Sequence, residues 1–415
     1  MNRTLPLLCT LALLAAAPAG SDSPLPWSEP AAVGLSAADL DAIPRTLQRW
    51  IDDGSVGGAV SLVARRGRLV HWEAIGYRDL ASRTPLERTD IFRICSMTKP
   101  VTSVAVMMLV EAGRLTLDEP VSRTLPEFEH AQVYDAGEIV APRRPVTIRD
   151  LLRHTSGLTY GLFGDTDVDA LYREADVFSG DLENLVSEAA ALPLLAHPGT
   201  RWNYGVSTDV LGRVVEVASG QRLDEFFGAR IFEPLGMQDT AFVVPPEKAG
   251  RLSTAYTRGP DGALREDDVA LCGVHDTQPE LLLGGAGLVS TAADYLRFAQ
   301  MLLDEGTLDG VRLLTPETVR KMRTNQLPEH LIPISIGGPD PGYGFGLGFS
   351  VLTDAGATPY GDNDGVFRWR GYASTYFWID PEDDLIGVLL SQVAPPTSPD
   401  IEREFQTRVY DALLD

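Results

Sequence analysis

Strand-like segments lie near the two ends of this chain, and that distribution constrains the fold most strongly. Residues 58–63 and 69–77 show the alternation of a β-hairpin around the turn Arg65-Arg66-Gly67. The strand pattern returns only in three late segments, residues 343–353, 372–379 and 385–392. Residues 95–310 are mainly helical in pattern and rich in loops. We therefore expect an α+β fold, in which one antiparallel sheet from both chain ends is flanked by helices and carries an inserted, mainly helical region.

Apolar residues at helical spacing predict two further helices at the chain ends, residues 37–53 and 400–414. No repeat or low-complexity linker divides the chain. We predict a single catalytic unit whose cleft lies where its two parts meet. The expected boundaries are 20–415 for the unit, about 28–94 and 311–415 for its α/β part, and about 95–310 for its helical part.

The N-terminal residues 1–19 have the features of a secretory signal peptide. Arg3 provides positive charge, residues 5–14 are apolar, and Ala17-Pro18-Ala19 is a small-residue cleavage site. The apolar run is too short for a permanent anchor, and no later segment offers a long uncharged apolar stretch. The sequence therefore predicts export to the periplasm or the extracellular space, with no integral membrane segment in the mature chain.

Charge and composition exclude some partners. The formal net charge is −23, from 35 basic and 58 acidic residues, so nucleic acid and anionic membranes are disfavoured. The six histidines are scattered and H-E-x-x-H is absent, so we expect neither a metal nor another cofactor. Cys95 and Cys272 remain after signal cleavage. An oxidising compartment permits a bridge between them, but two buried free thiols are the favoured interpretation.

The segment Ser96-Met97-Thr98-Lys99-Pro100 opens a helix that is apolar on nearly all sides. Proline is well tolerated only in a first helical turn, so the helix should begin near Ser96. Ser96 and Lys99 then project from one face. Desolvation favours the uncharged form of an amine, which can take a proton from a neighbouring hydroxyl. The helix N-terminus would favour negative charge near the serine oxygen.

The Ser-x-x-Lys pattern alone is weak, because it also describes a helix cap followed by a surface lysine. This chain has only three lysines, Lys99, Lys248 and Lys321, and only Lys99 has a serine three positions before it. That match falls at the start of the most apolar helix. We therefore predict Ser96 as a nucleophile and Lys99 as its activating base.

Two more segments carry candidate functional groups. Tyr204 precedes a predicted helix over residues 210–219 and could share the base role with Lys99, although an aromatic residue there is more often packing. Gly371 lies at the entry to the predicted strand 372–379. The N–H groups of Tyr372 and Ser96 could form an oxyanion hole there, or the glycine could merely bend the strand.

These three segments together resemble the serine β-lactamase and penicillin-binding protein superfamily, most closely class C β-lactamases and family VIII carboxylesterases. The resemblance runs from about residue 30 to the C-terminus. It includes Ser96-Met97-Thr98-Lys99, Tyr204-Gly205-Val206, and Trp369-Arg370-Gly371, which stands where β-lactamases carry Lys-Thr-Gly. It implies a β-lactamase/transpeptidase-like fold and an acyl-enzyme cycle. In that cycle Ser96 attacks a carbonyl while Lys99 and Tyr204 shuttle the proton. The resemblance also implies that Val206, Trp369, Arg370, Gly371 and Tyr372, together with Ser96, bind the substrate.

Departures from the β-lactamase pattern point to an ester substrate. Val206 replaces an asparagine that binds the amide side chain of a β-lactam, and Trp369 occupies the position of a lysine that attracts the drug's carboxylate. Arg370 is not equivalent to that lysine. Losing both polar contacts weakens binding of an anionic β-lactam more than that of a neutral ester. Gly205 and Arg370 also depart from the usual Tyr-Ser-x and Trp-Gly-Gly of the esterase branch.

We therefore predict a carboxylesterase that acts on small to medium acyl esters. Open alternatives are a β-lactamase or D-amino-acid peptidase acting on amides, an acyltransferase with an alcohol acceptor, and an inactive binding scaffold. The expected partner is a small-molecule ester or amide. No G-x-S-x-G occurs, which disfavours an α/β-hydrolase. Residues 160–185 are expected to form a solvated loop, because their aspartates lack the spacing of a calcium loop.

Overall fold

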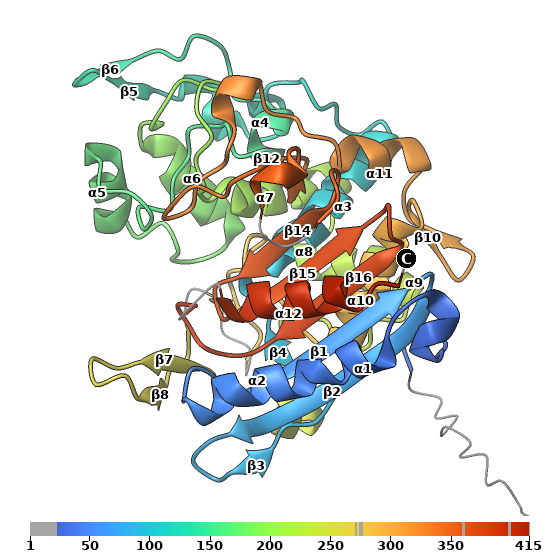
Figure 1. Cartoon of the computed structure of the whole chain (residues 1–415). Coiled ribbons are helices and arrows are strands. Elements are labelled where there is room, and N and C mark those ends of the chain that lie inside the picture. Colours follow the sequence, from blue (N-terminus) through green and yellow to red (C-terminus); the bar gives the residue numbers. More distant parts are fainter. Residues whose placement is uncertain (1–22, 270–271, 274–276, 359–361, 397–399, 415) are drawn as a thin grey trace, which may run out of the picture.

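The computed structural model describes residues 23–269, 272–273, 277–358, 362–396 and 400–414. The predicted signal peptide, residues 1–19, lies outside the described residues. The described chain forms a sheet part, which combines both chain ends, and a helical part packed against it (Figure 1).

The central sheet has eight antiparallel strands in the order β12-β13-β14-β15-β16-β1-β2-β3. β1 lies between its hairpin partner β2 and the late strand β16, so Leu62 pairs with Trp72 on one side and Val388 on the other. The strands are β1 (Gly58–Arg65), β2 (Arg68–Asp79), β3 (Thr84–Pro85), β12 (Tyr343–Phe345), β13 (Ser350–Leu352), β14 (Phe367–Gly371), β15 (Thr375–Asp380) and β16 (Leu385–Leu390). This arrangement confirms the predicted sheet from both chain ends.

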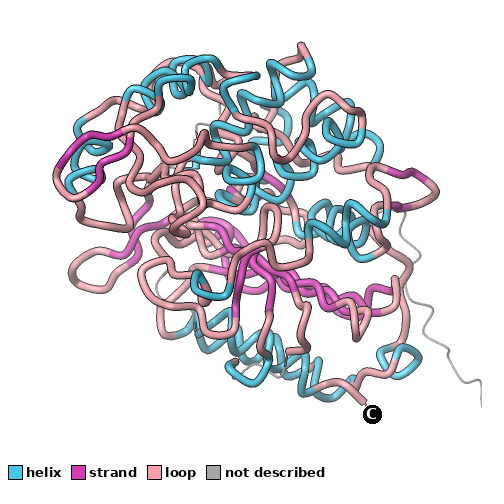
Figure 2. Tube along the Cα trace, turned by 90° about the horizontal axis from the view of Figure 1, so that it is seen from above, coloured by secondary structure: helices cyan, strands magenta, loops and turns pink. Residues whose placement is uncertain are grey.

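Helices cover both faces of the sheet (Figure 2). One face carries α1 (Ala37–Leu40), α2 (Ala42–Asp52) and α12 (Asp400–Asp411), and the other carries α10 (Ala292–Leu303). Every residue of β1, and likewise of β15 and β16, is buried, as expected for strands covered on both sides. The two predicted terminal helices are therefore present, the first of them divided at Asp41.

The helical part surrounds α3 (Thr98–Glu111), whose residues from Thr98 to Leu109 are all buried. α3 packs against α7 (Ser207–Ser219) and α8 (Leu223–Phe227). The other helices are α4 (Ile148–Leu152), α5 (Asp167–Glu174), α6 (Leu182–Ala191), α9 (Glu233–Leu235) and α11 (Pro316–Met322). No helix of the described residues is both long and apolar enough to cross a membrane.

Short strand pairs also occur within the helical region, which the sequence pattern did not predict. Two- and three-residue strands are too short to show an alternation of polarity. The pairs are β4 (Phe92–Arg93) with β9 (Val289–Ser290), β5 (Val133–Asp135) with β6 (Glu138–Val140), β7 (Tyr256–Arg258) with β8 (Leu264–Glu266), and β10 (Thr307–Leu308) with β11 (Val311–Arg312).

Three predicted segments differ from the structure. Residues 343–353 form the hairpin β12–β13 and not one strand, with Gly348 at φ 108° in the reversal. The predicted strand 372–379 begins only at Thr375, because the chain reverses after β14 through Ser374, which has φ 59°. The predicted loop 160–185 contains α5, whose first turn is closed by a capping box between Thr166 and Asp169.

The buried histidine of the hairpin β1–β2 gives a test of this packing. His71 Nε2 lies 2.8 Å from Ser61 Oγ, and burial, assisted by the charge of Arg88, lowers the pKa of His71 from 6.5 to about 4. Unfolding therefore takes up a proton between pH 6.5 and 4, so the free energy of unfolding falls as pH falls through that window. In urea unfolding at pH 7 and pH 5, His71→Gln should lose less stability than the wild type. Equal losses would contradict the assignment.

Candidate active site

The start of α3 is held in place by buried contacts. A 3-10 turn over Cys95–Met97 leads directly into the helix, and Pro100 lies in its first turn, where its missing N–H has no cost. The side chain of Thr98 accepts a hydrogen bond from the backbone N–H of Leu288 at 3.1 Å. Ser96 consequently stands at the mouth of the helix and Lys99 one turn inward, as the sequence predicted.

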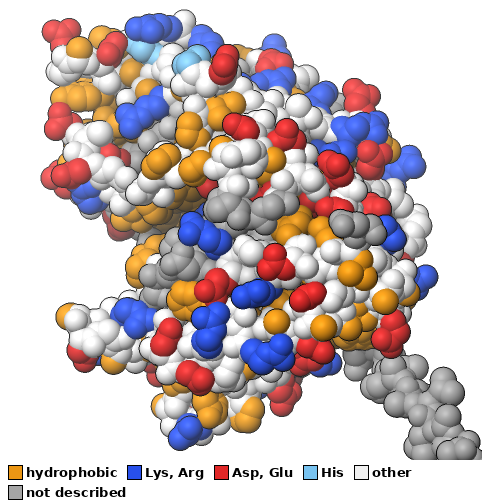
Figure 3. All heavy atoms as spheres, viewed as in Figure 1, with side chains coloured by type: hydrophobic (Ala, Val, Ile, Leu, Met, Phe, Trp, Pro, Cys, Tyr) orange, Lys and Arg blue, Asp and Glu red, His pale blue; other side chains and the backbone are white. Residues whose placement is uncertain are grey.

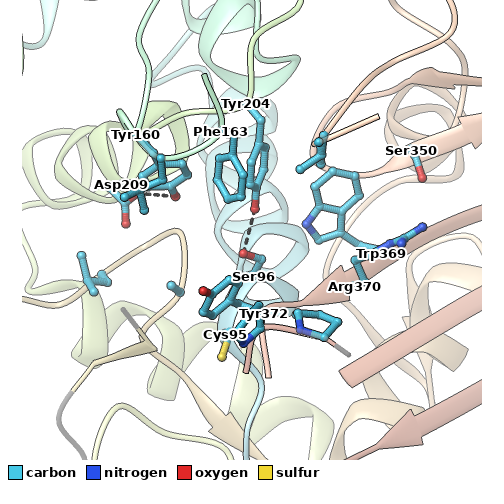
Figure 4. A pocket seen from close by; sticks show the side chains of 18 of the residues that line it. Cys95, Ser96, Tyr160, Phe163, Tyr204, Asp209, Ser350, Trp369, Arg370 and Tyr372 are labelled. Carbon is cyan, nitrogen blue, oxygen red and sulfur yellow. Dashed lines mark hydrogen bonds between the residues drawn. The ribbon is translucent and has the colours of Figure 1, made fainter. Parts of the chain in front are cut away.

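The structure brings Ser96, Lys99 and Tyr204 together (Figure 4). The Tyr204 hydroxyl donates a hydrogen bond to Ser96 Oγ at 2.7 Å, and Lys99 Nζ donates to the same oxygen at 3.3 Å. Tyr204 lies in the segment before α7 and is 108 residues away from Ser96 in the sequence. The serine hydroxyl therefore has two groups beside it that can exchange protons with it.

Lys99 is fully buried, and its side-chain nitrogen hydrogen-bonds to three different groups. Besides Ser96 Oγ, Lys99 Nζ donates to the carbonyl of Gly285 at 2.7 Å and to the Tyr160 hydroxyl at 3.1 Å. Nζ also lies 4.7 Å from the centre of the Tyr204 ring. A lysine nitrogen has at most three N–H groups. The three contacts with Ser96, Tyr160 and Gly285 therefore fix its position next to the serine.

A buried tyrosine–aspartate pair supports Lys99, and sequence reasoning missed its role. The Tyr160 hydroxyl donates to Asp209 at 3.0 Å, and the N–H of Gly285 donates to the other Asp209 oxygen at 2.8 Å. Burial, with the nearby Asp209, raises the pKa of Tyr160 well above its usual value, so Tyr160 keeps its proton. Asp209, a carboxylate in the first turn of the apolar helix α7, was the only sequence signal of this pair.

Tyr204 is enclosed by aromatic rings. Ring centroids of His154, Phe163 and Trp369 lie 5.1, 5.4 and 5.6 Å from that of Tyr204. Burial, together with the charge of Lys99, lowers the pKa of His154 well below 6.5. The imidazole is therefore neutral near pH 7 and packs against Tyr204 as an uncharged ring.

The third predicted segment forms one wall of the site. β14 ends at Gly371, where a Cβ atom would collide with the carbonyl of Ile94 and with Thr375 Oγ1. Thr375 Oγ1 donates to the same Ile94 carbonyl at 3.2 Å. The glycine thus permits the close approach of β14 to the turn that carries Ser96, and Tyr372 follows at the pocket wall beside Ser96 (Figure 4). Gly371 thus allows a close approach, but the group that comes close to it is the backbone carbonyl of Ile94.

A pocket of about 1130 Å³ opens above Ser96. It lies at the hollow between the sheet part and the helical part, where hydrophobic side chains gather (Figure 3). Trp369, Arg370, Gly371 and Tyr372 contribute one wall, whereas the opposite wall is largely aromatic and aliphatic, with Tyr160, Leu162, Phe163 and Phe178. Val206, a predicted substrate-binding residue, lies outside the pocket, because its side chain is fully buried where α7 begins.

Cys95 and Cys272 form a disulfide, so the prediction of two free thiols is wrong. Their Cα atoms lie 4.7 Å apart although 177 residues separate them in the chain, a distance that only tertiary structure reveals. The bond ties the residue before Ser96 to a segment whose neighbours Gly273, Thr277 and Gln278 line the pocket. Among the described residues, no group of three or more His, Cys, Asp or Glu side chains could hold a metal ion.

A family model described as "Beta-lactamase" matches residues 17–412. The chain belongs to the beta-lactamase family. Esterase EstB of Burkholderia gladioli is 32% identical over 396 residues, covering 88% of this chain and 94% of that protein. An uncharacterized protein of Mycobacterium tuberculosis is 40% identical over 372 residues, covering 87% and 92%.

Solved structures agree with this assignment. A structure titled "EstCE1, a hydrolase with promiscuous acyltransferase activity" superposes with a TM-score of 0.78 at 30% identity, covering 90% of this chain and 99% of that one. The superfamily and the β-lactamase/transpeptidase-like fold expected from the sequence are therefore confirmed. This beta-lactamase-family protein is a serine hydrolase.

The disulfide beside Ser96 should stabilise the fold measurably. Cys272→Ser opens a loop of 177 residues, so we expect the free energy of unfolding to fall by roughly 2–5 kcal/mol. A reductant should lower the melting temperature of the wild type and leave that of the variant unchanged. A wild type whose melting temperature resists reductant and equals that of the variant would contradict the expectation.

The Tyr160–Asp209 pair should affect activity through Lys99. Tyr160→Phe removes the hydroxyl that accepts from Lys99 Nζ, and we expect kcat/KM for an ester to fall roughly tenfold or more. Tyr172→Phe is the matched control, because Tyr172 is also a buried tyrosine and its hydroxyl is not among the hydrogen-bond partners of Lys99 Nζ, which are Ser96, Tyr160 and Gly285. Steady-state kinetics with a melting curve for each variant makes the test. Equal activity of Tyr160→Phe and wild type would show that the pair does not position the amine.

Proposed function

We propose that this protein is a carboxylesterase that forms an acyl-enzyme on Ser96. The observation that carries the proposal is the position of Ser96 Oγ in a largely apolar pocket, 2.7 Å from the Tyr204 hydroxyl oxygen and 3.3 Å from Lys99 Nζ. Either neighbour, once it has lost its own proton, can accept the hydrogen of the serine hydroxyl. A half-buried hydroxyl that faces a pocket and has two such neighbours meets the geometric requirement for an activated nucleophile.

In the proposed cycle Ser96 Oγ attacks the ester carbonyl carbon and passes its proton to the Lys99–Tyr204 pair. The pair acts as one coupled acid–base unit. The N–H groups of Ser96 and Tyr372 stabilise the oxyanion. The bond between the carbonyl carbon and the alcohol oxygen then breaks, and the alcohol leaves with the proton held by the pair. Water attacks the acyl-enzyme, gives up a proton to the same pair, and releases the carboxylic acid while Ser96 recovers its hydrogen.

The pocket favours an ester over a β-lactam. Trp369 lines the wall where the β-lactamase pattern has a lysine, and the Arg370 side chain points away from Ser96 and Tyr204 (Figure 4). A carboxylate close to the nucleophile would therefore find an indole in place of a cation. Relatives named as esterases, EstB among them, support the same choice.

Acyl transfer to an alcohol is the second candidate. A pocket of about 1130 Å³ can hold an acyl group together with an acceptor, and EstCE1 is described as a hydrolase with promiscuous acyltransferase activity. The chemistry differs only in the second step, in which an alcohol in place of water attacks the acyl-enzyme. Both activities need Ser96, so the choice between them depends on which nucleophile reaches the acyl-enzyme.

Two chromogenic substrates test the proposal. We expect hydrolysis of p-nitrophenyl butyrate at a kcat/KM at least roughly a hundredfold above that for a chromogenic cephalosporin, because the cation for the cephalosporin carboxylate is missing. Ser96→Ala is the control and should abolish ester turnover. The opposite preference would favour the β-lactamase or peptidase alternative. A folded wild type that turns over neither substrate would favour the binding scaffold.

A further inference from the structure

A pair of charged side chains faces the same pocket at a distance from Ser96. Arg370 lies on β14 directly after Trp369, and Glu402 lies in the first turn of α12. Both line the pocket. In Figure 4 the Arg370 side chain extends on the far side of Trp369 from Tyr204. Two elements of the sheet part thus place a donor group and an acceptor group together in a pocket whose opposite wall is apolar.

With the described residues Arg370 forms only long ion pairs, which leave hydrogen-bonding capacity on both Arg370 and Glu402. Arg370 Nη1 lies 3.7 Å from Glu402 Oε2, and Arg370 Nη2 lies 3.8 Å from Asp340 Oδ2, both beyond hydrogen-bond length. Neither Arg370 nor Glu402 makes a side-chain hydrogen bond to a described residue. The Glu402 side chain is only 7% exposed. Both side chains line the pocket, so a polar group of a ligand can complete their hydrogen bonding there.

The neighbouring Arg368 lines the same pocket wall but, unlike Arg370, makes short hydrogen bonds to other side chains. It donates to Asp340 at 2.7 Å and to the Tyr376 hydroxyl at 3.2 Å, and it packs 3.7 Å from the centre of the Tyr343 ring. Its side chain is 3% exposed, compared with 36% for Arg370. Arg368 therefore has a structural role, whereas Arg370 presents N–H groups to the pocket.

The charges around the pair favour a neutral polar ligand over an anion. Asp340 and Glu402 balance Arg368 and Arg370. Along the whole pocket wall four acidic residues, Asp209, Glu280, Asp340 and Glu402, accompany three basic ones, Arg368, Arg370 and Arg403. An incoming carboxylate would meet no net positive charge. A hydroxyl group both donates and accepts, so it can bind Glu402 and Arg370 at once.

We infer that Arg370 and Glu402 form a polar subsite for a hydroxyl-bearing part of the ester substrate. The substrate class is then an amphipathic ester, with an apolar group against Tyr160, Leu162, Phe163 and Phe178 and a hydroxylated group at the Arg370–Glu402 pair. This inference rests on the proposed esterase function, because it assigns the substrate of the Ser96 site.

Matched esters test the inference. Glycerol monobutyrate and propyl 3-hydroxybutyrate carry hydroxyls on the alcohol and acyl sides, and propyl butyrate is the reference for both. We expect at least one hydroxylated ester to exceed propyl butyrate in kcat/KM by roughly tenfold or more. That ratio should fall close to one in Glu402→Gln and in Arg370→Gln. Glu404→Gln is the control on the same helix, since Glu404 binds Arg49 and Trp50 on α2, and it should keep the wild-type ratio.

The outcomes separate the two proposals. Ratios near one in the wild type, or a ratio that survives in both variants, would overturn the polar subsite while ester hydrolysis stands. A stronger preference for the monopropyl ester of succinate, which carries a carboxylate, would replace the hydroxylated ligand by an anion and would also overturn it. If a fluorophosphonate fails to label Ser96, the esterase proposal is wrong and the subsite assignment falls with it.

Discussion

The placement of one buried amine governs the architecture of this site. Lys99 is fully buried, and its nitrogen is held between Ser96 Oγ, the Tyr160 hydroxyl and the Gly285 carbonyl. A charged or polar group in such a position is stable only if its hydrogen bonds are complete. The surrounding structure supplies them from three separate segments. Hydrogen bonds of the Lys99 nitrogen therefore join α3 to the loop before α5, through Tyr160, and to the loop before α10, through Gly285.

The sheet supplies the other half of the site. Because β1 pairs with β16, the N-terminal hairpin and the C-terminal strands form one rigid layer, and β14 within it reaches the turn before α3. Gly371 allows that approach, and the disulfide Cys95–Cys272 ties the same turn to the pocket rim. Ser96 thus stands on a turn that is held from the helical side by Lys99 and from the sheet side by β14. Such support fixes Ser96 next to Lys99 and Tyr204.

The sequence predicted those features that depend on local pattern. The apolar helix behind Pro100 placed Ser96 and Lys99 on one face, and the strand patterns near both chain ends indicated the sheet, because periodicity and proline geometry act over a few residues. Features that depend on distant segments were missed. Nothing local indicates that Cys95 meets Cys272, that Tyr160 bridges Lys99 and Asp209, or that β14 is a strand of its own. Val206 illustrates the same limit, since its motif position suggested a contact that its burial prevents.

In the proposed function, Ser96 is a nucleophile whose reactivity depends on Lys99. The rate at which a fluorophosphonate labels Ser96, followed by intact-protein mass and peptide mapping, tests it most directly in wild type and in Lys99→Met, a substitution of similar volume. We expect a single adduct on the peptide that carries Ser96 and a labelling rate at least roughly a hundredfold slower in the folded variant. Labelling at another residue, or equal rates in the two proteins, would contradict it.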